Sequence, residues 1–284
     1  MRDEDLRASV NIDDRRGSSG AVRGGLGIGA VVVLTLIGWA TGIDPSALIN
    51  GAEQVRGGPA VQQQAGRAGA PTDEVGGFVA RILGETEDVW NATLPEQAGR
   101  RYEAPVLVLF SGATTSGCGT AQSAMGPFYC PLDRKLYLDT AFFNDMRARM
   151  GGGGEFAYAY VIAHEVGHHI QNLLGILPRV QEAQRAAGDR AVANAISVRT
   201  ELMADCLAGV WANRMQARRG NLDEADLRQA VSTAAAIGDD RLQQQSRGRV
   251  VPDSFTHGSA EQRVQALLAG LRGGNIQGCN TFTN

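Results

Sequence analysis

The chain of 284 residues lacks an excess of positive charge: it carries 27 Lys and Arg against 30 Asp and Glu, a formal net charge of −3. Proteins that bind nucleic acid by electrostatic attraction usually present a basic surface, so the composition argues against that class. Glycine is abundant, at 37 residues, but follows no three-residue period, which excludes a collagen-like protein. The hydrophobic fraction of 43% is ordinary for a globular protein and permits a sizeable core.

Cysteines are few, and no two of them are spaced as Cys-x-x-Cys. That spacing is typical of structural zinc sites, so a site built from all four cysteines is disfavoured. In an oxidising compartment four cysteines permit two disulfides, with three possible connectivities. We prefer Cys118–Cys130, which would staple a hairpin, and Cys206–Cys279, which would tie the C-terminal tail to a helix. Four free, buried thiols are the alternative.

One long segment, from Gly24 to Ile43, carries no charge and is about long enough to cross a bilayer as a helix. A buried core helix is the alternative, but an apolar run of this length near a chain end favours a membrane span. Arg56 is the only nearby cation after the run, whereas five arginines precede it. They are Arg2, Arg7, Arg15, Arg16 and Arg23. Because Arg and Lys are enriched on the cytoplasmic side, we expect a cytoplasmic N-terminus and an extracytoplasmic remainder.

The same region could instead be a cleaved signal peptide, since residues 40–42 (Ala-Thr-Gly) have the spacing of a cleavage site. The polar region before the run is long for a signal peptide, so we favour an uncleaved anchor. We therefore expect a cytoplasmic tail at 1–23 and a transmembrane anchor at 24–43. Residues 44–73, rich in Gly, Ala, Gln and Pro, are typical of a flexible linker. The folded domain would then comprise residues 74–284.

The pattern of this domain predicts a small sheet followed by helices. Apolar residues recur at helical spacing from Val75 to Trp90. Strand candidates follow at 105–112, 126–130 and 135–139. Further helices are expected from about residue 142 to the glycines at 151–154, from 155 to 174, and from 191 to 218. This order predicts an α+β fold.

Three of the four histidines lie in one predicted helix, in the sequence His164-Glu165-Val-Gly-His168-His169. Residues four apart share a helix face, about 5–6 Å along, so His164 and His168 can converge on one Zn²⁺. Glu165 lies about 100° around the helix, where it can take a proton from zinc-activated water. His169 points off the ligand face. This HExxH pattern is typical of zinc peptidases, and a helix with solvated histidines is the alternative.

A catalytic zinc needs a third protein ligand and an open position for water. A histidine six residues after His168 would complete one known pattern, but Leu174 stands there. Glu201, on a later predicted helix, is the best candidate. Asp205, one turn further on, is expected to bind the free ring nitrogen of a ligating histidine, and we expect this to be His164. Taken alone, such an acidic pair is usually a solvated helix face.

The fourth histidine, His257, follows a loop. A lone histidine in that position is most often a surface or core residue. Here it is a candidate hydrogen-bond donor to the oxyanion of the tetrahedral intermediate. Arg263 could assist it or could merely anchor the loop. The alternative is that His257 is itself the third zinc ligand.

These motifs resemble the predicted neutral zinc metallopeptidase family of bacterial membrane-anchored proteins, the YpfJ type. The resemblance covers nearly the whole chain, from NIDDRRGSSG near the start through SGCG and GPFYCP to YVIAHEVGHH, ELMADCLAGVW, AIGDDRLQQQS and GRVVPDSFTHGS. It implies a zincin-like fold with one N-terminal transmembrane helix. More broadly, HExxH followed by ExxxD is similar to the gluzincin peptidases. Their prenyl-protein peptidase branch also has a late His with an Arg six residues on, matching His257 and Arg263.

One departure is the gap between His168 and Glu201, longer than in thermolysin-like enzymes and shorter than in the prenyl-protein peptidases. The sequence as a whole predicts a membrane-anchored, zinc-dependent endopeptidase that acts on protein or peptide substrates. In zincins an edge strand pairs with extended substrate, and residues 135–139 are the candidate. The alternative function is a membrane-tethered binding or scaffold protein that keeps zinc and has lost turnover. The intact Glu165 speaks against it.

Overall fold

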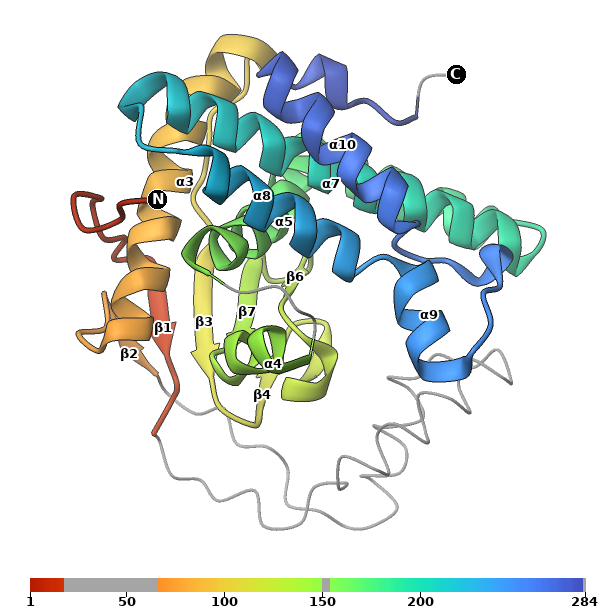
Figure 1. Cartoon of the computed structure of the whole chain (residues 1–284), viewed down its shortest axis with the longest axis horizontal. Coiled ribbons are helices and arrows are strands. Elements are labelled where there is room, and N and C mark those ends of the chain that lie inside the picture. The colour runs from red at the N-terminus through yellow and green to blue at the C-terminus, as the bar shows by residue number, and fades with distance from the viewer. Residues whose placement is uncertain (18–65, 150–153, 283–284) are drawn as a thin grey trace.

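The computed structural model describes residues 1–17, 66–149 and 154–282 (Figure 1). Its strands are β1 (Ile12–Asp14), β2 (Arg67–Ala68), β3 (Val106–Phe110), β4 (Ala113–Ser116), β5 (Gly119–Gln122), β6 (Phe128–Cys130) and β7 (Lys135–Asp139). Its helices are α3 (Glu74–Ala98), α4 (Ala141–Arg149), α5 (Glu155–Leu173), α6 (Ile176–Ala186), α7 (Arg190–Arg219), α8 (Glu224–Ala236), α9 (Asp239–Arg247) and α10 (Ala260–Gly273). The predicted mixture of a small sheet and many helices is confirmed.

The main sheet has the strand order β2-β1-β3-β7-β6. The three inner strands β1, β3 and β7 are parallel to one another, while β2 and β6 run antiparallel at the two edges. The β3 sequence Val-Leu-Val-Leu-Phe is apolar throughout, as expected for an inner strand covered on both faces. The hairpin of β4 and β5 forms a separate small sheet that the Gly- and Ser-rich sequence did not reveal.

The prediction that residues 135–139 form an edge strand able to pair with substrate is wrong. That segment is β7, which pairs with β3 on one side and with β6 on the other. A tight turn containing Arg134, with a left-handed φ of 57°, lies between β6 and β7 and folds β6 onto the open side of β7. The edge strand on this side of the sheet is therefore β6.

Helix α5 lies at the centre of the fold, between the strands and helices α7 and α8 (Figure 1). It contacts α7, α8, α6, α3 and strand β6, and nearly all of its side chains are buried. Its N-terminus follows Gly154 and its last turn ends before Gly175, which has a left-handed φ of 70°. The helix that carries the HExxH sequence is thus held on all sides by packing.

Both preferred cysteine pairings are confirmed by disulfides at Cys118–Cys130 and Cys206–Cys279. Cys118 lies in the turn between β4 and β5, and Cys130 ends β6, so the first bond joins the two sheets rather than the two strands of one hairpin. The second bond attaches the C-terminal segment to α7, as predicted.

The N-terminal segment differs from the expectation of a separate tail at 1–23. Residues 12–14 form β1, an inner strand of the main sheet, and the folded unit also includes β2 at 67–68. The expected anchor at 24–43 and most of the expected linker lie outside the described residues. Among the helices that the structure does describe, none is both long and apolar enough for a bilayer span.

Candidate metal centre and active site

The ligand candidates from two helices meet as the sequence predicts. His164 and His168 lie one turn apart on α5, and Glu201 reaches them from α7. The Nε2 atom of His164 is 3.1 Å from one carboxylate oxygen of Glu201, and the Nε2 atom of His168 is 3.5 Å from the other. One ligand atom from each residue lies within 4.8 Å of the other two, a grouping that can hold a metal ion.

The chemistry and spacing of this group fit zinc. Zinc prefers imidazole nitrogens and carboxylate oxygens at about 2.0–2.2 Å, in a tetrahedral arrangement. The edge of such a tetrahedron is about 3.3–3.5 Å, since it equals about 1.6 bond lengths. The Nε2 atoms of His164 and His168 lie 3.1 and 3.5 Å from Glu201, each from a different carboxylate oxygen. With one ligand atom taken from each residue, the three atoms lie within 4.8 Å of one another, so the donors fit zinc in kind and are near to its ligand spacing.

Each imidazole is oriented by a hydrogen bond at its other nitrogen. The Nδ1 atom of His164 lies 2.8 Å from Asp205 Oδ1, as predicted. The Nδ1 atom of His168 lies 2.9 Å from Gln171 Oε1, and the Gln171 amide donates to the carbonyl oxygen of Thr200 on α7 at 2.7 Å. Both Nε2 atoms are thereby left to face Glu201. The sequence analysis missed Gln171, although its spacing of three residues from His168 was a usable signal.

Asp205 is the hub of a buried network. It accepts hydrogen bonds from the Tyr160 hydroxyl at 2.6 Å and from two nitrogens of Arg263, both at 2.9 Å. Burial alone would raise the pKa of Asp205, but Arg263 and His164 outweigh it and lower the pKa to about 2. Asp205 is therefore an anion that can fix the tautomer of His164. Tyr160, one turn before His164, was also missed.

Arg263 lines the cleft, and its guanidinium binds the buried carboxylate of Asp205. Only 3% of the residue is exposed, and its guanidinium also donates to the Ile237 carbonyl oxygen at 3.4 Å. Direct help to an oxyanion, one of the two roles predicted for Arg263, stays a prediction. The structure favours an anchoring role, since Arg263 holds Asp205 and the segment that follows α8.

Glu165 lines the same cleft as His164 and His168 and is buried. Within the described part of the chain, its carboxylate takes part in no hydrogen bond or ion pair. Its oxygens can therefore accept a hydrogen bond from a water molecule in the cleft.

His257 lines the cleft and is held by Asp239. One oxygen of Asp239 accepts the backbone N–H groups of Thr256, His257 and Gly258 at 2.7, 2.6 and 3.1 Å. The other lies 3.3 Å from His257 Nδ1. Burial lowers the pKa of His257, but Asp239 and Glu201 raise it more. With 51% of its side chain exposed, His257 is outside the three-residue grouping, so the grouping does not support it as the third ligand.

The cleft above the site has a volume of about 530 Å³. Phe128 and Tyr129 of β6 line one part of it, and Leu177 and Val180 of α6 line another. The lining therefore combines an open strand edge with apolar side chains, which suits an extended peptide.

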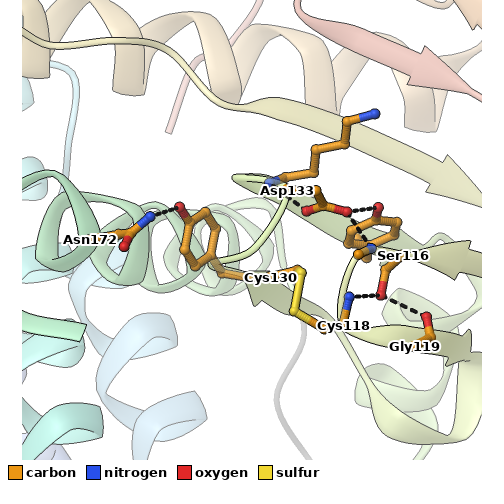
Figure 2. Close-up of a disulfide and its surroundings, with 10 residues drawn as sticks. Ser116, Cys118, Gly119, Cys130, Asp133 and Asn172 are labelled. Carbon is orange, nitrogen blue, oxygen red and sulfur yellow. Dashed lines mark hydrogen bonds between the residues drawn. A yellow bond between two sulfur atoms is a disulfide. The ribbon is translucent and has the colours of Figure 1, made fainter. Parts of the chain in front are cut away.

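Strand β6 is fixed from both sides, as Figure 2 shows. The Cys118–Cys130 disulfide joins its end to the turn of the small hairpin. The Asn172 amide, from the last turn of α5, donates to the Tyr129 hydroxyl at 2.9 Å. The same hydroxyl lies 3.0 Å from Nδ1 of His169. His169 thus points away from His164 and His168 and helps to hold β6 against α5. Burial lowers the pKa of His169 to about 4, so it is neutral.

Gly167 sets how closely the two ligand-bearing helices approach. A Cβ atom at Gly167 would lie 2.9 Å from the Ala204 carbonyl oxygen and 3.2 Å from its Cα. We expect Gly167→Ala to push α5 from α7, to separate the histidines from Glu201, and to weaken zinc binding by about tenfold. Competition with a chromogenic chelator measures this. Gly188→Ala, where an added Cβ meets nothing within 4 Å, is the control. Unchanged affinity in both variants would show that helix contact does not set the ligand spacing.

Comparisons with known proteins show which family the chain is similar to. A protein-family model described as "Putative neutral zinc metallopeptidase" matches residues 1–282. "Uncharacterized protein YpfJ" of Escherichia coli (strain K12) is 46% identical over 295 residues, covering 99% of both chains. "Uncharacterized protein Rv2575" of Mycobacterium tuberculosis (strain ATCC 25618 / H37Rv) is 46% identical over 206 residues, covering 69% of this chain and 66% of that one. No solved structure matches the chain.

Proposed function

This chain belongs to the neutral zinc metallopeptidase family, and from that premise we propose that it is an endopeptidase using a zinc-activated water. One observation carries the proposal. Two imidazoles from one turn of α5 meet the Glu201 carboxylate of α7, with Glu165 beside them in a cleft that suits a peptide. A purely structural zinc site has no use for a free carboxylate next to an open cleft.

The roles of the residues follow from their positions. His164, His168 and Glu201 would hold the zinc, whose chemistry is to polarise the scissile carbonyl and to lower the pKa of a water toward about 7. Glu165 accepts the proton of the attacking water and passes it to the leaving amine. His257 donates a hydrogen bond toward the oxyanion that forms on the substrate. Asp205 keeps His164 in the tautomer whose Nε2 is free to bind.

We further propose that the protein is attached to a membrane through the apolar run at 24–43 and that the peptidase domain lies outside the cytoplasm. The two disulfides support the second statement, because such bonds persist in oxidising compartments and are rare in the cytosol. Protein or peptide substrates would then be encountered outside the cytoplasm.

Metal removal tests the proposed activity. The full chain, purified in detergent, should contain one zinc per molecule and cleave casein. Phenanthroline should abolish the cleavage, and stoichiometric Zn²⁺ should restore it where Mg²⁺ does not, because the donor set of two imidazoles and one carboxylate suits zinc. Zinc-loaded protein that cleaves neither casein nor a peptide library would overturn the proposal in favour of a zinc-stabilised binding protein.

A further inference from the structure

Strand β1 is embedded in the main sheet. It pairs in parallel with β3, where Ile12 faces Leu107 and Asp14 faces Leu109, and its other side pairs with β2. The Ile12 side chain belongs to the main hydrophobic core. Removing β1 would expose the ladder groups and apolar surface of β3. The segment that precedes the apolar run is thus a structural part of the peptidase domain.

The residues before β1 are tied to helix α3. Glu87, which is buried on α3, accepts hydrogen bonds from Arg7, Ser9 and Asn11 at 2.7, 2.5 and 2.8 Å. The backbone of Ser9 also donates to Ala80 at 2.8 Å. Without these partners the Glu87 carboxylate would be a buried, unpaired charge, which strongly destabilises a fold. The contact between residues 7–11 and α3 therefore stabilises the domain.

The first seven residues of the chain also contact helices α3 and α8. Arg81 of α3 binds the carboxylate of Asp3 at 2.7 Å, and the terminal amine of Met1 pairs with Asp226 of α8. At Gly84 an added Cβ would lie 2.0 Å from the carbonyl oxygen of Arg7, so the N-terminal backbone runs directly against the helix.

The two ends of the segment at 18–65 meet at one place. Asp14 is the register partner of Arg67, and an added Cβ at Gly66 would lie 1.8 Å from a carboxylate oxygen of Asp13. Arg16 continues the contact, since its guanidinium binds Asp73 at the start of α3 at 2.6 Å. The described residues on either side of that segment therefore lie at neighbouring points of the sheet edge.

We propose that residues 1–17 lie in the same compartment as the peptidase domain. Neighbouring strands are about 4.8 Å apart, whereas the hydrocarbon core of a bilayer is about 30 Å thick. A single crossing between residues 17 and 66 would place β1 and β3 on opposite sides, where they cannot pair. The proposal replaces the expected cytoplasmic N-terminus, and it holds whether or not the chain is an active peptidase.

Three of the five arginines that indicated a cytoplasmic N-terminus have another explanation in the fold. Arg7 pairs with Glu87 and Asp88. Arg15 and Arg16 each pair with an aspartate two residues earlier in the chain, and Arg16 also pairs with Asp73. These cations are matched to carboxylates of the same domain, so their presence before the apolar run does not measure membrane orientation.

Thiol labelling of two variants that each add one cysteine tests the compartment. Val10 and Leu132 are 70% and 73% exposed, one in the N-terminal segment and one in the peptidase domain, so cysteine at either site should fold and react. All four natural cysteines are in disulfides, which keeps the background low. The full chains carrying Val10→Cys or Leu132→Cys are produced in a bacterium. Intact spheroplasts and lysed ones are then treated with a membrane-impermeant maleimide.

We expect both variants to be labelled in intact spheroplasts, to the same extent as after lysis. Labelling of one variant before lysis and of the other only after lysis, in either combination, would overturn the proposal. Labelling of both only after lysis would support a shared compartment and would overturn the extracytoplasmic location proposed above. The two proposals therefore fail in distinguishable ways, and neither result depends on catalytic activity.

Discussion

Glu165→Gln should lower kcat for peptide hydrolysis by about 10²–10⁴-fold, the usual contribution of a general base, while zinc stays bound. Glutamine has nearly the same size as glutamate but cannot accept the proton of the attacking water. Glu165 lies beside the grouping of His164, His168 and Glu201 without belonging to it, so the ligand set is unchanged. Turnover of a fluorogenic peptide and zinc content per chain are the two measurements.

The matched control is Glu155→Gln, the same substitution in the first turn of the same helix. Glu155 is not among the residues that line the cleft, so its variant should keep both zinc and turnover. Equal activity in Glu165→Gln and the unmodified chain would rule out the proposed mechanism. Loss of zinc in Glu165→Gln would instead show that this carboxylate binds the metal.

Asp205→Asn should affect stability and metal binding together. It leaves the buried Arg263 without its anionic partner, a change that typically costs about 3 kcal/mol or more. It also weakens the hold on His164 Nδ1, and loss of such a support typically lowers zinc affinity by about 10–100-fold. Urea unfolding in the presence of chelator measures the first effect, and chelator competition measures the second.

A second substitution separates the two effects. In the double variant Asp205→Asn with Arg263→Gln, no charge is left unpaired at this position, so much of the lost stability should return. Zinc affinity should stay low, because His164 still lacks an anionic partner. If the double variant regained both properties, Arg263 rather than His164 would be the partner through which Asp205 acts. If Asp205→Asn bound zinc at full strength, the proposed support of His164 would be absent.

The metal site was largely predictable because its first part is local. A spacing of four residues places His164 and His168 on one helix face whatever the fold around them. To predict Glu201 as a ligand, one must know which later helix packs against α5. That packing depends on the absence of a side chain at Gly167, and the sequence alone does not show that α7 contacts this glycine. The buried contact of Arg263 with Asp205, which favours an anchoring role, could not be read from the sequence.

The place of the N-terminal segment could not be predicted from local patterns. Strand β1 is three residues long and two of them are aspartates, a residue depleted in strands. Its pairing with β3 joins parts of the chain more than ninety residues apart, and nothing in either segment specifies that register. The neighbouring arginines instead indicated a cytoplasmic N-terminus. In a sequence, arginines that form ion pairs within a fold look the same as arginines that set membrane orientation.

The inner position of β1 bears on how the chain could be prepared without its apolar run. A chain shortened to begin after residue 65 would lose β1. The apolar Val-Leu-Val-Leu-Phe strand would then present an unpaired border, which invites association between copies. Asp14 and Arg67 are register partners. Deleting the residues between them and joining the two ends with a short turn would therefore remove the apolar run at 24–43 and keep β1 in the sheet.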